Sequence, residues 1–155
     1  MISAYACMGV IFAAPAAAVA FAKGRPQTMK DALGRAWKAV GYGEGLALTM
    51  LIVGVFTVNL GRRGRVHLPE LDTLTESALL GLCATLAIAL FAGWMTLRFS
   101  ARMARMGMRM VFLLLLLVFF FRSSRLPEVG LTGAGLCLLI SGLMVYLLHR
   151  EVNPS

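Results

Sequence analysis

Five long runs of apolar residues, separated by short polar segments, divide this 155-residue chain. A membrane-spanning helix needs ~20 predominantly apolar residues, and four of the five runs are about that long. The pattern therefore predicts an all-α integral membrane bundle that forms a single transmembrane domain over residues 1–155. The predicted spans are residues 2–22, 42–60, 74–97, 106–121 and 129–148.

Two of these runs leave an alternative open. The run at 106–121 is the shortest, and if it dips into the membrane without crossing, the chain has four spans and both termini lie on one side. The run at 2–22 has no basic residue before it. Because a secretory signal peptide begins with a positively charged region, we expect a span here and not a cleaved signal.

The amino-acid composition agrees with that expected of an integral membrane protein. Hydrophobic residues make up 59% of the sequence and charged residues 14%, whereas soluble domains are ~45–50% apolar and ~25% charged. The net charge is +8. In a soluble protein this charge would suggest nucleic acid as a partner, but in a membrane protein Lys and Arg set the orientation. We therefore expect no nucleic-acid partner.

The basic residues are distributed unevenly among the segments that connect the spans. Lys and Arg concentrate in the cytoplasmic loops of membrane proteins. With the N-terminus outside and the C-terminus inside, ten Lys and Arg residues face the cytoplasm and five lie outside. The inverse orientation reverses this distribution, so the sequence favours N-out, C-in insertion, by default in a bacterial inner membrane.

Four arginines between the third and fourth predicted spans stand four, three and four residues apart, which on a helix forms one stripe. They are Arg98, Arg102, Arg105 and Arg109. We expect the stripe to anchor the fourth span, because long Arg side chains extend to the lipid headgroups. The alternative is a surface that binds anionic phospholipids or the acidic residues of a partner.

Residues 28–40 form a predicted basic amphipathic helix, because apolar residues recur at helical spacing among Lys and Arg. A helix of this kind suits the headgroup region of an anionic membrane. Trp37 and Lys38 are therefore candidates for the same lipid or partner surface as the arginines. The alternative is a plain cytoplasmic connection to the second span.

Small residues repeat every four positions along the third span and along part of the fifth. Such ridges let another helix backbone approach closely, which drives helix association in membranes. We expect the two ridges to pack the third and fifth spans together, or to dock a different subunit. The ridge residues are Ser77, Gly81, Thr85, Ala89 and Gly93 in the third span, and Gly133, Cys137 and Ser141 in the fifth.

Glu44 is the acidic residue to consider for chemistry, since it lies at the edge of the second span. An ionisable group inside a membrane indicates a functional site by default. Glu44 is therefore a candidate ion or proton site in a transporter. The alternative is an interfacial ion pair with Lys38 or with an arginine of the stripe.

Catalytic, metal and cofactor motifs are missing from the sequence. His67 and His149 fall on opposite sides of a hydrocarbon core ~30 Å thick, so they cannot share a haem iron. No CxxC, phosphate-binding loop or Ser-His-Asp pattern occurs. The three cysteines lie in apolar runs and are expected to behave as small hydrophobic residues. We expect no cofactor and no metal.

These observations together favour a non-catalytic accessory or assembly subunit of a larger membrane protein complex. Its expected partners are other membrane subunits and anionic phospholipids. The alternative is a small transporter or channel that works as a homo-oligomer with Glu44 as its ionisable centre. A lipid-modifying enzyme would need a cluster of acids or nucleophiles at one interface, and the sequence offers none.

Overall fold

Five α-helices make up nearly all of the described chain in this computed structural model, which describes residues 2–61, 71–122 and 130–154. The helices are α1 (Ile2–Ala22), α2 (Met29–Gly61), α3 (Leu71–Arg98), α4 (Ala101–Arg122) and α5 (Gly130–Val152). The described residues contain no strand, so the predicted all-α class is confirmed for this part of the chain.

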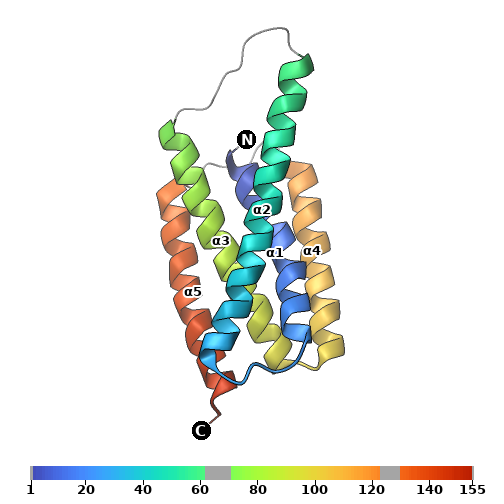
Figure 1. Ribbon diagram of the computed structural model, residues 1–155, viewed down its shortest axis with the longest axis vertical. Helices are drawn as coiled ribbons and strands as arrows, with labels where there is room; N and C mark the ends of the chain where they lie inside the picture. Colours follow the sequence, from blue (N-terminus) through green and yellow to red (C-terminus); the bar gives the residue numbers. More distant parts are fainter. Residues whose placement is uncertain (1, 62–70, 123–129, 155) are drawn as a thin grey trace.

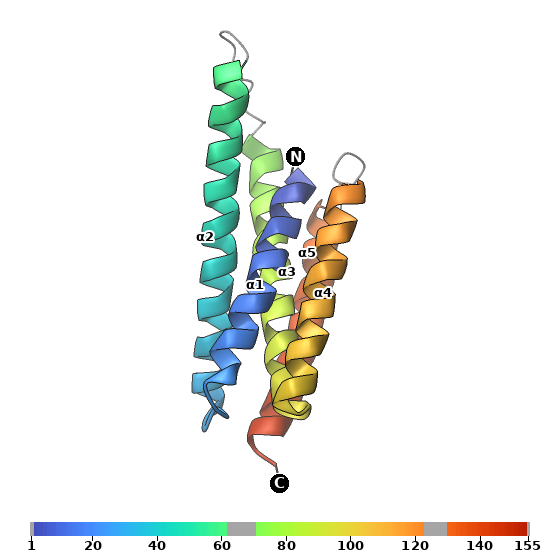
Figure 2. The same ribbon diagram turned by 90° about the vertical axis from the view of Figure 1, so that its right-hand side faces the viewer.

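The helices lie side by side and alternate in direction along one bundle (Figure 1). Helix α3 is central, since it packs against α1 and α5 and also contacts α2 and α4. Helices α2 and α4 lie at opposite edges, with α1 between them (Figure 2). The end of α1, the start of α2, the turn from α3 to α4 and the end of α5 meet at the lower end of the bundle in Figure 1.

Helix α2 joins two segments that the sequence pattern separates. The predicted amphipathic segment 28–40 and the predicted span 42–60 are one continuous helix. Thr28 caps its start, because its Oγ1 accepts a hydrogen bond of 3.2 Å from the Asp31 amide. No proline interrupts the helix after this cap. The sequence changes from polar to apolar residues near Gly41, but the backbone remains helical across this change.

The arginine stripe is divided between two helices, which corrects the prediction of a single helical face. Arg98 is the last residue of α3, and Phe99 and Ser100, which follow it, are outside both α3 and α4. Ser100 precedes α4, a position that serine favours, and its carbonyl accepts the first helical bond from the Ala104 amide at 2.9 Å. Arg102, Arg105 and Arg109 therefore belong to α4, which begins five residues before the predicted fourth span.

The core consists mainly of small side chains that bring the helix backbones close together. A Cβ atom added to Gly43 of α2 would lie 2.6 Å from the carbonyl oxygen of Gly9 in α1. A Cβ added to Gly9 would lie 2.7 Å from Cγ2 of Thr85 in α3. Only glycine permits such close approach. Alanines fill most of the remaining contacts between these helices, among them Ala13, Ala17, Ala36, Ala39, Ala89 and Ala92.

Part of the small-residue ridge of α3 faces α1, and α3 also packs against α5, so the expected packing of the third predicted span on the fifth is confirmed at the level of the helices. Gly93 packs directly against the Phe21 ring of α1, and Thr85 packs against Gly9. The Ala-rich α1 is slender enough to fit this ridge. Helix α5 also contacts α3, and its ridge residues Gly133 and Ser141 are buried.

The outer surface of the bundle is apolar over most of its length. Large hydrophobic side chains are exposed on α2, α4 and α5, with Phe56 at 66% and Leu139 at 75% exposure. By length and composition, two described helical stretches are apolar enough to cross a membrane: Ala78–Arg98 and Leu131–Val152. Cys7–Ala22 is a shorter apolar helix.

Candidate functional site

Glu44, near the middle of α2, lies at a junction of three helices. Its carboxylate Oε1 lies 3.0 Å from the Thr85 hydroxyl of α3. The Gly9 position of α1 completes the junction, since a Cβ added there would come within 3.1 Å of the same oxygen. Glu44 is half-buried and Thr85 is fully buried. The sequence draws attention to both residues separately, but does not pair them.

The Thr85 hydroxyl lies close to three possible hydrogen-bond acceptors but can donate only one proton. Besides Glu44, its Oγ1 lies 2.9 Å from the carbonyl oxygens of both Gly81 and Leu82. A hydroxyl donates one proton and accepts through two lone pairs. It donates to Glu44 when the carboxylate is ionised. It accepts from Glu44 when the acid is protonated, and then donates to a backbone carbonyl. The junction therefore suits both protonation states of Glu44.

A second concentration of polar groups lies at the lower end of the bundle, where Arg35 holds the connection between α1 and α2. Its guanidinium forms an ion pair of 3.0 Å with Asp31 and donates to the carbonyl oxygen of Gly24 at 2.6 Å. It also reaches the carbonyl of Ala20 at 3.5 Å. Gly24 has a φ of 130°, which glycine adopts easily, so the connection turns sharply there.

Glu151 holds the end of α5 against the same region. Its carboxylate accepts from Arg98 of α3 at 3.5 Å, and its backbone carbonyl accepts from Arg25 in the connection after α1. Asp31 and Glu151, the acids described at this end, are thus both in ion pairs. Seven further cations at this end are exposed: Lys23, Lys30, Lys38, Arg102, Arg105, Arg109 and Arg150.

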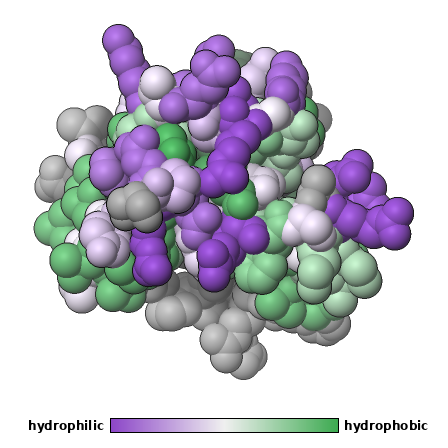
Figure 3. All heavy atoms as spheres, turned by 90° about the horizontal axis from the view of Figure 1, so that it is seen from below, coloured by the Kyte–Doolittle hydropathy of each residue, from purple (hydrophilic) through white to green (hydrophobic). Residues whose placement is uncertain are grey.

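Viewed from below, hydrophilic residues gather over this end, and hydrophobic residues lie on either side of them (Figure 3). We call this surface, formed by the seven exposed cations, the basic end. Trp37 is 60% exposed on α2. It shares this end of the bundle with Arg105 and Arg109, but α2 and α4 lie at opposite edges (Figure 2). The structure therefore places the predicted lipid-binding or partner-binding residues at one end, but not in one patch.

Among the described residues, the remaining candidates do not form a cluster that could hold a metal ion. Within the described ranges, no three His, Cys, Asp or Glu side chains gather to hold a metal ion. His149 lies 3.4 Å from the Asn153 amide, and His67 falls outside the described residues. Cys7, Cys83 and Cys137 are free thiols. The side chain of Ser77, the first residue of the α3 ridge, is also outside the part of the structure that is described.

Comparison with models of protein families, with curated proteins and with solved structures finds no match to this chain.

Proposed function

We propose that this chain is a non-catalytic subunit of a larger membrane protein complex, inserted N-out and C-in through all five helices. The apolar exterior supports insertion. In the two helices that are apolar enough to cross a membrane, only 44% and 28% of the most apolar window is buried. A helix in the core of a soluble protein would be mostly buried, whereas apolar surface this extensive indicates lipid or a protein partner around it.

The observation that carries the subunit proposal is a row of open glycines on α2. Gly34, Gly41 and Gly45 lie on the face opposite the helix's buried alanines, and no atom lies within 4 Å of a Cβ placed on any of them. Each glycine costs a helix roughly 1 kcal/mol relative to alanine. A face that contacts only lipid gains nothing from such notches, but a second helix can approach there closely.

The contrast with α4 strengthens this interpretation. Its exposed face carries bulky side chains, among them Leu113, Leu114 and Leu117. Such a surface suits disordered lipid tails and offers no notch for a partner backbone. Around the α2 glycines, Trp37 and Tyr42 are exposed at 60% and 68%. Large aromatic side chains of this kind are enriched in protein interfaces.

The experiment is purification in mild detergent followed by mass spectrometry of what accompanies the chain. We expect a companion membrane protein in stoichiometric amount, and its loss in Gly41→Leu and Gly45→Leu. Gly135→Leu on α5 is the matched control, because Gly135 is also exposed with open space around it. A chain that purifies alone or as a homo-oligomer contradicts the proposal.

The Glu44–Thr85 junction favours a second candidate, a small homo-oligomeric transporter that moves an ion or proton. A site that accommodates both protonation states of an acid is what proton exchange requires. In proteoliposomes, Glu44→Gln would then abolish transport while leaving the bundle intact. If Glu44→Gln leaves assembly with the companion unchanged and no transport is measurable in the wild type, the subunit proposal stands alone.

A further inference from the structure

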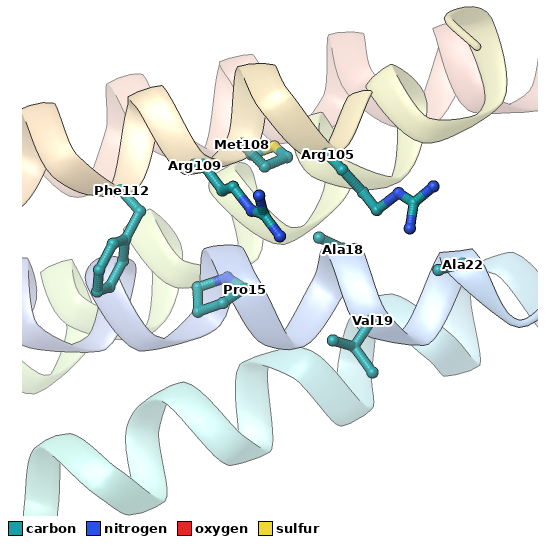
Figure 4. Close-up of a pocket in the computed structure, with 8 residues that line it drawn as sticks. All are labelled: Pro15, Ala18, Val19, Ala22, Arg105, Met108, Arg109 and Phe112. Carbon is teal, nitrogen blue, oxygen red and sulfur yellow. The ribbon is translucent and has the colours of Figure 1, made fainter. Parts of the chain in front are cut away.

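A groove of about 250 Å³ runs between α1 and α4 (Figure 4). One wall is the face of α1 that carries Pro15, Ala18 and Ala22, and the other is contributed by Met108 and Phe112 of α4. Small side chains on α1 and the proline ring leave the trough open.

Two arginines complete the lining of this apolar groove. Arg105 and Arg109 stand one turn apart on α4, a rise of ~6 Å, and both side chains extend from α4 toward α1 (Figure 4). A guanidinium binds phosphate through paired hydrogen bonds. The groove therefore combines an apolar trough with two groups suited to one phosphate.

The charge of the groove matches an anion. Asp31 and Glu151, the acids described at the lower end, form ion pairs with Arg35 and Arg98. Neither acid lines the groove. Arg109 lies eight residues into α4, about 12 Å above its start, and Pro15 and Phe112 line the groove beyond it (Figure 4), so a phosphate on the two arginines leaves this part of the trough open for an acyl chain.

We propose that this groove binds one anionic phospholipid, with its phosphate on Arg105 and Arg109 and part of one acyl chain between Pro15 and Phe112. The groove is smaller than the ~300–1,000 Å³ of a typical small-molecule pocket, so it takes a segment of one chain and not a whole lipid. This lipid-binding proposal depends on the proposed insertion of the chain in a membrane. It does not depend on the proposed partner subunit.

The first test measures binding of fluorescent phosphatidylglycerol to the purified chain in mild detergent, with fluorescent phosphatidylcholine as the neutral probe. Arg105→Gln and Arg109→Gln should each weaken phosphatidylglycerol binding about fivefold. Arg102→Gln is the matched control, because Arg102 is exposed on the same helix but does not line the groove. Arg109→Lys keeps the charge and should retain more binding than Arg109→Gln, which separates lost binding from lost folding.

The second test fills the trough and leaves both arginines in place. Ala18→Leu projects into the groove, and we expect it to weaken phosphatidylglycerol binding at least as strongly as Arg109→Gln. Any of these results with the lipid probes overturns the proposal: an Arg102→Gln effect equal to that of Arg109→Gln, normal binding in Ala18→Leu, or equal binding of phosphatidylcholine. Competition by inorganic phosphate at low concentration also overturns it, since the trough would then contribute nothing. Retention of a companion protein is a separate readout and reports on the subunit proposal alone.

Discussion

The Thr85 hydroxyl of α3 lies 3.0 Å from the Glu44 carboxylate of α2, so a polar contact joins two helices inside a core made mostly of alanine and glycine. Glu44 is half-buried, and the Thr85 hydroxyl also lies within hydrogen-bonding distance of two carbonyl oxygens of its own helix, so the contact links the Glu44 carboxylate to the α3 backbone. The contact therefore fixes the register of α2 against α3. It also makes the junction sensitive to small changes in chemistry.

Replacing Thr85 by Val keeps the shape of the side chain and removes its hydroxyl. Because Glu44 then loses a donor at a half-buried position, we expect the free energy of unfolding to fall by about 1–3 kcal/mol. Thermal unfolding in detergent, followed by circular dichroism, measures this loss. Thr85→Ser keeps the hydroxyl and should be milder. A Thr85→Val protein as stable as the wild type would show that the contact contributes nothing.

Two neighbouring glycines of α2 provide a test of the close helix packing. A Cβ on Gly43 would lie 2.6 Å from the Gly9 carbonyl oxygen and 2.8 Å from the Ala13 Cβ, whereas nothing lies near Gly45. Gly43→Ala should destabilise the isolated chain by about 1–3 kcal/mol through overpacking. Gly45→Ala should be neutral or slightly stabilising, because alanine favours the helix. Equal unfolding temperatures for the two variants would contradict the α1–α2 contact.

Hydrophobic runs alone predict the positions of most helices in this chain. The predicted spans 2–22, 74–97 and 129–148 match α1, α3 and α5 within a few residues, because a long apolar run has few alternatives to a helix, even with Pro15 inside α1. The continuity of α2 is less visible in the sequence, because a change of polarity at Gly41 suggests a boundary where the backbone has none.

The partners of each helix face are harder to predict than the helices. The four-residue spacing of Gly81, Thr85, Ala89 and Gly93 indicates a close approach, but spacing carries no information on which helix approaches. Likewise, the spacing of the four arginines suggests one stripe only if the helix continues, and the break at Ser100 separates Arg98 from the others. Thr85 and Glu44 are 41 residues apart in sequence, so no local pattern pairs them.

The proposed N-out, C-in topology predicts how single cysteines label. In intact cells, Arg63→Cys should react with a membrane-impermeant maleimide, while Lys30→Cys should react only after permeabilisation, because Lys30 belongs to the basic end. Asn153→Cys distinguishes five spans from four, since only with five does the C-terminus share the cytoplasmic side with Lys30. These variants are made in a background without the native cysteines. Labelling of Lys30→Cys from outside would invert the orientation.

Arg35 and Arg98 each form an ion pair through a guanidinium group, but the two pairs differ in distance and in exposure. Arg35 is bound to the Asp31 carboxylate and also donates to the backbone carbonyls of Ala20 in α1 and Gly24 in the α1–α2 connection. Arg98 makes one ion pair of 3.5 Å and its side chain is largely exposed. We expect Arg35→Ala to lower the free energy of unfolding by about 1.5–3 kcal/mol and Arg98→Ala by less than about 1 kcal/mol.

The two variants should also respond differently to ionic strength. Salt screens exposed ion pairs but affects backbone hydrogen bonds much less. Raising the ionic strength should therefore erase the small effect of Arg98→Ala and preserve most of the effect of Arg35→Ala. Thermal unfolding of the two variants at low and high salt provides the measurement. If Arg98→Ala is the more damaging variant at high salt, Arg35 does not hold the connection between α1 and α2, and the end of α5 is fixed mainly through Glu151.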